Sequence, residues 1–180
     1  MLERTQNKTQ RNRFTRMCIG EALISLMQTA DFPDIRISHL VRRAGVSRMT
    51  FYNYYSSKHD VLTDYLEEII SLYLAESRQR TDIGVFQDYQ HILFSLKFFD
   101  RYRTFFLTLT RAGLHSIIIN AINDFMLRQF SHAFDDSIYK LYVYAGALLN
   151  IFLKWEEDGR IRSAEETAMI IYNIFVNPHP

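Results

Sequence analysis

The chain is poor in the residues that interrupt secondary structure or cross-link it. Its 180 residues include 6 Gly, 3 Pro and 1 Cys. So few turn-forming residues argue against a fold of many short strands and favour long helices. The single cysteine, Cys18, has no second thiol to pair with, which excludes an internal disulfide and a dithiol redox centre. At 48% apolar residues, the chain can still bury a substantial core.

Long apolar runs are missing as well. A membrane-spanning helix needs roughly 18 or more consecutive apolar residues. The apolar runs around Ile117–Ile119 and Leu148–Phe152 are short and bounded by polar groups. The first ten residues, MLERTQNKTQ, lack the apolar segment of a secretory signal. These features predict a soluble, cytoplasmic protein with no membrane partner.

The formal net charge of +1 hides an uneven distribution of charge along the chain. Residues 1–60 contain ten Lys or Arg against five Asp or Glu, and residues 61–180 contain eleven against fifteen. A basic N-terminal third on an acidic remainder favours contact between that third and a polyanion such as nucleic acid. A basic arm that is merely solvated would show the same imbalance.

Apolar residues recur at helical spacing along the chain, and no segment alternates with a period of two for long. The pattern predicts an all-α fold with a polar, frayed segment over residues 1–10 and a turn at Asp31–Asp34. A short helix is expected to follow Ser47. The other expected helices span residues 11–30, 37–44, 58–80, 85–99, 101–112, 115–134, 137–158 and 163–176.

The segment IRISHLVRRAGVSRMTFYNYYSSKHDVL, residues 35–62, has the spacing of a helix-turn-helix. Two short helices flank a tight turn, in which Gly45 suits a left-handed helix cap and Ser47 suits an N-cap. Phe51 and Tyr55, one turn apart, are expected to face the core. Ser57 is expected to cap the long helix that follows.

The outward face of the second helix carries groups that suit DNA. The Arg48 side chain can hydrogen-bond a guanine edge, and the Asn53 side chain can hydrogen-bond an adenine edge. The hydroxyl groups of Thr50 and of the tyrosines can donate to phosphates, and the Lys58 ammonium can meet a phosphate at the start of the next helix. The alternative is a plain bend in which the tyrosines pack a hydrophobic junction.

The run AGVSRMTFYNYYSSKHDVL resembles the signature of the tetracycline-repressor (TetR) family of bacterial transcriptional regulators. The matched positions are Ala44, Gly45, Val46, Ser47, Thr50, Phe51, Tyr52, Tyr55, Lys58 and Leu62. The run YAGALLNIFLKWEEDG, within the last third of the chain, more loosely resembles the C-terminal region of regulators of dihydroxyacetone kinase genes.

The resemblance implies about nine helices, divided between a DNA-binding domain over residues 1–57 and a dimerisation and effector-binding body over 58–180. It implies a homodimer on palindromic operator DNA, often a repressor that releases DNA when a small molecule binds the body. The second helix would enter the major groove. The implied DNA contacts are Arg36, Ser47, Arg48, Met49, Thr50, Tyr52, Asn53, Tyr54 and Lys58.

Two positions depart from the family pattern. Arg36 stands where the family usually has Thr or Ser, and arginine can reach a phosphate but cannot cap a helix. Val41 stands where the family usually has Ala, so the first two helices are expected to pack slightly further apart.

The last two helices carry apolar stripes that suit a dimer interface of four helices, although the same stripes would equally complete a monomer core. Gly146 would allow close approach of a second helix. The predicted interface residues are Tyr142, Ala145, Gly146, Leu149, Phe152, Ile171 and Phe175.

Aromatic residues are densest just before the middle of the body. An effector pocket is one interpretation of this density, and ordinary core packing is the other. The residues concerned are Phe98, Phe99, Tyr102, Phe105 and Phe106.

No cofactor site, metal site or catalytic constellation is expected. His132 and Asp135 lie three apart, but two ligands without a third do not make a metal site. Two alternatives to an effector-controlled repressor stay open. One is a regulator controlled by a protein partner, and the other is a helical enzyme or interaction module with a vestigial DNA-binding head.

Overall fold

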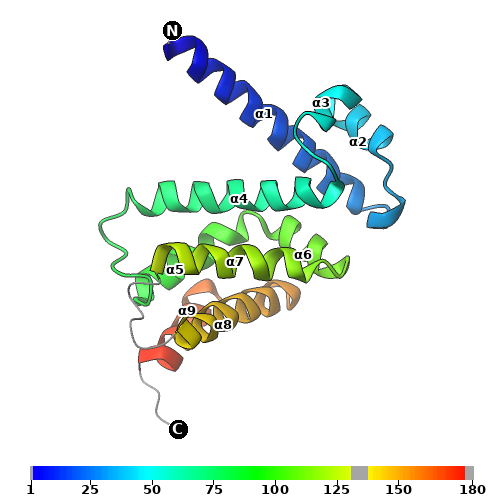
Figure 1. Ribbon diagram of the computed structural model, residues 1–180. Helices are drawn as coiled ribbons and strands as arrows, with labels where there is room; N and C mark the ends of the chain where they lie inside the picture. Colours follow the sequence, from blue (N-terminus) through cyan, green and yellow to red (C-terminus); the bar gives the residue numbers. More distant parts are fainter. Residues whose placement is uncertain (1, 131–137, 177–180) are drawn as a thin grey trace. The chain divides into compact units, whose positions relative to one another are not determined.

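Helices account for all the regular structure that the computed structural model describes, over residues 2–130 and 138–176. The expected all-α fold of about nine helices is therefore confirmed (Figure 1). The helices are α1 (Leu2–Met27), the 3₁₀ turn η1 (Phe32–Asp34), α2 (Ile37–Ala44), α3 (Arg48–Tyr52), α4 (Lys58–Ser77), α5 (Tyr89–Asp100), α6 (Arg103–Arg111), α7 (His115–Phe130), α8 (Ile138–Glu157) and α9 (Ala164–Val176).

The chain forms two compact units, Met1–Glu68 and Ile69–Pro180. The division falls inside α4 and not at residue 57, where the sequence places it. The first turns of α4 belong to the N-terminal unit because they are bonded to α1. Arg16 pairs with Asp64 at 2.5 Å, and Arg13 pairs with Glu68.

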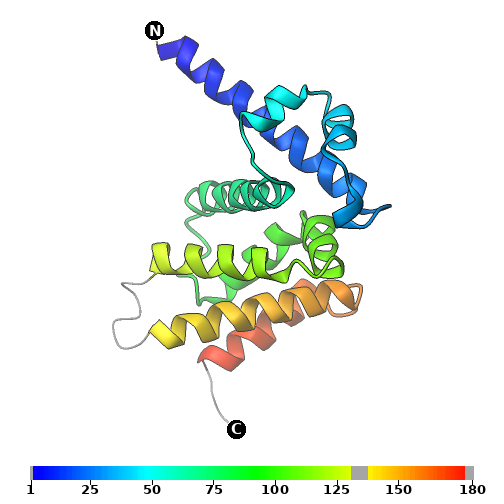
Figure 2. The same cartoon turned by 45° about the vertical axis from the view of Figure 1, so that its right-hand side comes forward.

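The first helix is longer at its start than the sequence predicts. The expected frayed segment over residues 1–10 is instead helical from Leu2 onward. This segment contains no Gly or Pro, and its Leu, Glu, Arg, Gln and Lys residues are good helix formers. In the N-terminal unit, α2 and α3 pack beside the C-terminal half of α1, and the first turns of α1 extend beyond them (Figures 1 and 2).

Helix ends in the N-terminal unit follow the predicted capping. Gly45 closes α2 at φ 67°, and the Val46 N–H donates to the Val41 carbonyl at 3.0 Å. The Ser47 hydroxyl accepts from the Thr50 N–H at 3.0 Å. Ser57 caps α4 by accepting from the Asp60 N–H at 3.2 Å, and the Asp60 carboxylate accepts from the Ser57 N–H in return.

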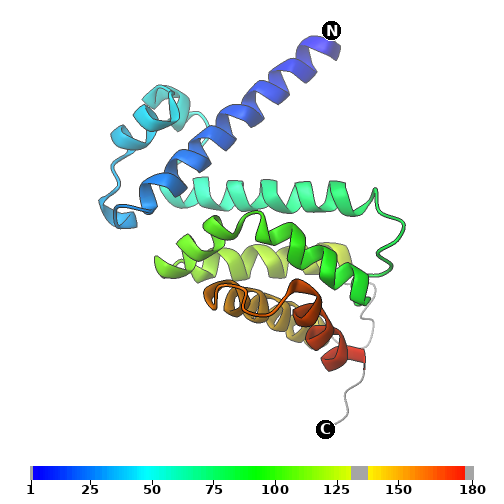
Figure 3. The same ribbon diagram turned by 180° about the vertical axis from the view of Figure 1, so that it is seen from behind.

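The C-terminal unit contains the rest of α4 and the five helices α5–α9. Helix α9 packs against α5 and α8, and α8 also packs against α6 and α7 (Figure 3). Helix α5 begins at Tyr89 and not near residue 85, because the Asp88 carboxylate accepts from the Val85 N–H at 2.8 Å and holds a turn there. None of the helices in the described ranges combines the length and apolar character that a membrane span requires.

Gly20 allows α1 and α4 to pack closely within the N-terminal unit. A Cβ atom at this position would overlap the ring of Tyr65. We expect Gly20→Ala to lower the free energy of unfolding by about 2 kcal/mol, because a well-packed contact must open. Chemical denaturation measures the change. Glu21→Ala, at the adjacent exposed position, is the control and should change stability by less than about 0.5 kcal/mol; equal effects of the two variants would contradict the packing argument.

Candidate nucleic-acid interface

The helix pair α2–α3 has the arrangement that the sequence predicts. The turn at residues 45–47 joins the two helices, and both lie against α1 in the two opposite views of the molecule (Figures 1 and 3). Leu40 and Val41 of α2 are buried. A pair of short helices held on a third in this way is the framework on which helix-turn-helix proteins present a recognition helix.

One side of α3 is buried as expected. Phe51 is fully inaccessible to solvent, and Tyr55, just beyond the end of the helix, is buried too. Their rings are 5.7 Å apart. The Tyr55 hydroxyl donates to Asp64 at 2.6 Å, and burial raises the pKa of this phenol well above its ordinary value. These two side chains set the rotation of α3 about its axis.

The other side of α3 faces solvent. Met49 is 76% exposed and Tyr52 is 58% exposed, and Arg48 is exposed as well. Two large apolar side chains next to an arginine on a five-residue helix form an unusual surface for solvent alone. Thr50 is half-buried, and its hydroxyl lies 2.9 Å from that of Ser47, so both side chains are partly engaged in the cap.

Exposed arginines within residues 36–48 lack acidic partners among the described residues. Arg36, Arg42 and Arg48 are exposed and form no ion pair with any residue that the structure describes. In the same unit, Arg13 and Arg16 are paired with Glu68 and Asp64. Arg42 was not among the predicted contacts, although its place in the last turn of α2, beside Arg43, is a signal that the sequence offers.

Two of the predicted contacts lie away from this surface. Tyr54 is half-buried, and its hydroxyl donates to Asn12 of α1 at 2.9 Å, so it fastens α3 to α1 and is not free for DNA. Asn53 is exposed but borders a groove that is also lined by Asp60, Asp64 and Glu67. These carboxylates would repel a phosphate backbone, so Asn53 lies at the edge of the candidate interface.

Lys58 does not have the free ammonium group that a phosphate contact requires. Its Nζ donates to the carbonyls of Phe32, of Pro33 at 3.2 Å and of Ile35 at 2.8 Å. The ammonium also lies 4.6 Å from the centre of the Phe32 ring. Three carbonyls match the three N–H donors, and partial burial lowers the lysine pKa. The expected phosphate contact is therefore replaced by a structural one, which holds the η1 turn against the start of α4.

The C-terminal unit contains a mainly apolar cavity of about 90 Å³, partly open to solvent. Of the five residues predicted to line a pocket, Phe99 and Phe106 line this cavity, and Phe98, Tyr102 and Phe105 do not. Phe98 lines a separate groove that also includes Glu76 and Arg101. For the phenylalanines of α5 and α6 the difference follows from helix geometry, because adjacent residues on a helix point about 100° apart. Tyr102 lies between the two helices.

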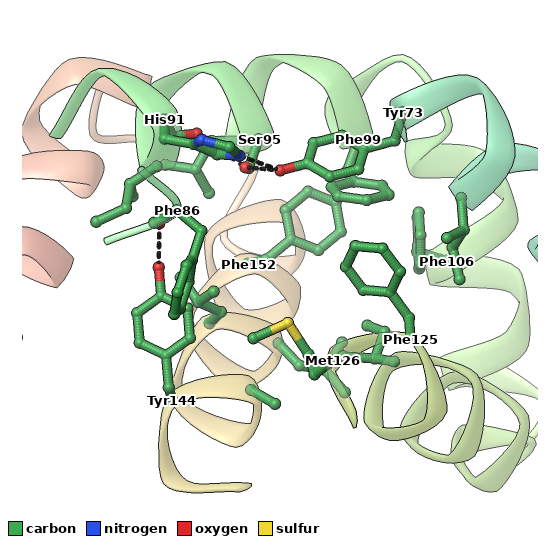
Figure 4. Close-up of a pocket in the computed structure, with 17 residues that line it drawn as sticks. Tyr73, Phe86, His91, Ser95, Phe99, Phe106, Phe125, Met126, Tyr144 and Phe152 are labelled. Carbon is green, nitrogen blue, oxygen red and sulfur yellow. Dashed lines mark hydrogen bonds between the residues drawn. The ribbon is translucent and has the colours of Figure 1, made fainter. Parts of the chain in front are cut away.

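The cavity also has a polar side that the sequence analysis missed. The Tyr73 hydroxyl lies 2.7 Å from His91 Nε2 and 2.9 Å from Ser95 Oγ (Figure 4). His91 and Ser95 share one face of α5 because they are four residues apart, a spacing that could have drawn attention to them. Burial raises the pKa of Tyr73 to about 12 and lowers that of His91.

Most of the predicted dimer residues are part of the core of this unit. Ala145, Leu149, Phe152 and Ile171 are buried within a single chain. The ring of Phe175 packs 4.7 Å from that of Tyr144, also in the same chain. The apolar stripes are broad enough that their centres complete the core, and only their margins face outward. The prediction of these five residues as interface residues is corrected accordingly.

The margins of the two stripes form a different exposed surface. Tyr142 remains 44% exposed, and Tyr139, at 78%, is more so. A Cβ atom at the half-buried Gly146 would meet no other atom within 4 Å, so the packing of one chain does not require glycine there. The other large exposed apolar residues of these helices are Ile138, Val143, Met169, Ile170 and Ile174.

Metal ligation has no support in the described ranges, where no three His, Cys, Asp or Glu side chains are grouped to hold an ion. His132 and Asp135 lie outside the described residues. Cys18 is half-buried on α1.

The bonds of Lys58 lead to a test of its role. We expect Lys58→Met to lower the free energy of unfolding by about 1–2 kcal/mol, because the methionine keeps the apolar stem and loses the bonds to three carbonyls. Denaturation measures the loss. The salt slope of DNA binding should stay unchanged, whereas Arg36→Ala, which removes an unpaired arginine, should reduce that slope by about 1. A reduced slope with unchanged stability in Lys58→Met would restore the phosphate contact.

Comparison of the chain with models of known protein families and with curated proteins finds no match to either.

Proposed function

We propose that this protein is a DNA-binding transcriptional regulator that places α3 in the major groove of an operator. The observation that carries the proposal is the exposed face of α3, formed by Arg48, Met49 and Tyr52 opposite the buried Phe51. Arg36 and Arg42, just before and within α2, are also exposed and form no ion pair with the described residues. The TetR resemblance of residues 44–62 supports the same function independently of these side-chain positions.

Each exposed group has a distinct role in this proposal. Arg48 bonds a base edge, with guanine as the best partner, and Met49 packs against a thymine methyl group. The Tyr52 hydroxyl, together with Arg36 and Arg42 of the preceding helix, contacts phosphates. Phosphate contacts supply affinity that depends on salt, and base contacts supply selectivity.

A homodimer is part of the proposal, because one five-residue helix reads too few base pairs to select a site. Two copies joined through the exposed faces of α8 and α9 would present two α3 helices to successive major grooves. The centres of such half-sites lie about 34–36 Å apart. The exposed Tyr139, Tyr142 and Val143, and the glycine at 146 that one chain does not need, support this choice of surface.

Repression relieved by a small molecule is the form of control that we propose. Helix α4 is a continuous helix whose first part belongs to the N-terminal unit and whose last turns belong to the C-terminal unit. A ligand in the C-terminal unit would act by preferring a conformation in which two α3 helices no longer match the half-sites.

The DNA proposal is tested by fluorescence anisotropy against DNA from upstream of the protein's own gene, titrated at several salt concentrations. We expect selective binding that Arg48→Ala weakens by about 1–3 kcal/mol, with relaxed preference at one base pair. Tyr52→Phe, which removes only a hydroxyl group, should weaken binding to all sequences alike.

Arg111→Ala is the charge-matched control for this experiment. Arg111 is exposed, forms no ion pair with the described residues and lies at the end of α6, outside the N-terminal unit. It should leave affinity unchanged. Binding no tighter than to random DNA, together with no enrichment when a random DNA pool is selected, would rule out the proposal.

The dimer proposal is tested by analytical ultracentrifugation. We expect Tyr142→Glu to shift the protein toward monomer, because it places a charge in the middle of an apolar contact. Val85→Glu introduces the same negative charge at an exposed apolar residue in the loop before α5, and it should leave the dimer intact. A wild-type protein that sediments as a monomer at micromolar concentration would contradict the interface.

A further inference from the structure

We infer that the cavity of the C-terminal unit binds a small uncharged molecule with one aromatic ring and one hydrogen-bond donor, such as a phenol. The ring would lie among the aromatic side chains, and its donor would bond the oxygens of Tyr73 and Ser95. The consequence for transcription rests on the proposed function, whereas the binding itself does not.

The residues that line the cavity are unsuited to a charged ligand. None of the residues that line the cavity is Asp, Glu, Lys or Arg. The two titratable groups of its polar side are neutral at pH 7, because burial moves the pKa of Tyr73 up to about 12 and that of His91 down. A carboxylate or ammonium group brought into this cavity would lose its hydration without gaining a counter-charge.

The walls favour an aromatic ring. Phe and Tyr rings from five helices, α4 to α8, and from the loop before α5 surround the space, and the Met126 side chain adds a polarisable sulfur atom (Figure 4). Aromatic rings and thioethers make directional contacts with an aromatic ligand beyond simple burial. The seven rings are those of Tyr73, Phe86, Phe99, Phe106, Phe125, Tyr144 and Phe152.

The size of the cavity limits the ligand to one ring. Its volume of about 90 Å³ is smaller than the roughly 150 Å³ of a core cavity that accepts benzene. Because this cavity is partly open, a single ring can enter if a few side chains shift, and a substituent can extend toward solvent.

The protons of the polar side are already used within the protein. His91 Nδ1 lies 3.3 Å from the Gly84 carbonyl, which selects the tautomer with its proton on Nδ1. Nε2 then accepts from the Tyr73 hydroxyl at 2.7 Å. The Ser95 hydroxyl donates to the His91 carbonyl at 2.8 Å, and Tyr73 Oη, 2.9 Å away, is a second acceptor for the same proton.

These bonds leave oxygen atoms that can still accept a hydrogen bond from a ligand. All three protons are directed at acceptors within the protein, so only lone pairs on Tyr73 Oη and Ser95 Oγ remain for a ligand. The fourth polar group of the lining, the Tyr144 hydroxyl, donates to the Phe86 carbonyl at 2.6 Å. The polar side of the cavity therefore recognises a donor and offers nothing to a ligand that can only accept.

Calorimetric titration of the full-length protein without DNA tests the inference. The probes are 4-methylphenol, 4-methylanisole, toluene and 4-methylbenzoate, which share one ring and differ in donor, acceptor and charge. We expect 4-methylphenol to bind about tenfold more tightly than toluene or 4-methylanisole, and 4-methylbenzoate not to bind measurably.

Methyl NMR of isotope-labelled methionine locates the binding. The chain has 6 Met, of which Met126 lines the cavity, and its resonance can be assigned with Met126→Leu. A ring bound in the cavity shifts this resonance and leaves that of Met49, on the exposed face of α3, in place.

Ser95→Ala separates recognition of the donor from binding by shape. It removes one of the two free acceptors and should reduce the preference for 4-methylphenol over 4-methylanisole by about threefold to tenfold. Thr110→Val is the matched control, because the Thr110 hydroxyl also donates to the carbonyl four residues earlier but does not line the cavity. The control should keep the full preference.

Three results would overturn the inference: equal affinity for 4-methylphenol and 4-methylanisole, binding of the benzoate, or binding that leaves the Met126 resonance unmoved. Each is measured without DNA, so none depends on the regulator being identified correctly. Conversely, binding of 4-methylphenol as expected without selective DNA binding would support the ligand site and contradict the proposed function.

Discussion

The burial of Phe51 and Tyr55 is the constraint on which the candidate interface depends. A helix of five residues has no stability of its own in water, so α3 exists because its inner side chains are held by the rest of the unit. Tyr55 bonds Asp64, and Arg16 of α1 pairs with the same carboxylate. These contacts fix the rotation of α3 about its axis. The side chains of Arg48, Met49 and Tyr52 therefore face solvent.

Contacts within the N-terminal unit also explain which cationic side chains remain available to bind a partner. Arg13, Arg16 and Lys58 serve the fold, because acidic groups or backbone carbonyls lie within their reach. Arg36 and Arg48 have no such partner among the described residues. A basic segment thus divides into cations that hold the unit together and cations that remain available to a polyanion, a division that net charge does not reveal.

The C-terminal unit combines a packed core with a space that the core does not fill. Its large aromatic side chains contact one another at centroid distances such as 5.2 Å between Phe106 and Phe152, yet they leave a cavity between α5, α7 and α8. Rigid rings cannot close every gap, and the hydrogen bonds of Tyr73 and Tyr144 prevent further collapse. A space held open in this way is suited to a ligand of matching shape.

The sequence alone determined the all-helical character of the fold, the caps at Gly45, Ser47 and Ser57 and the inward side of α3, because periodicity and capping act between residues close along the chain. Only the tertiary structure decided the direction of Lys58 and Tyr54, the boundary within α4 and the polar side of the cavity. These depend on partners such as Asn12 and the Phe32 carbonyl, which are distant in sequence. The apolar stripes of α8 and α9 show most clearly what sequence alone cannot predict, since an apolar residue is equally suited to a core and to an interface.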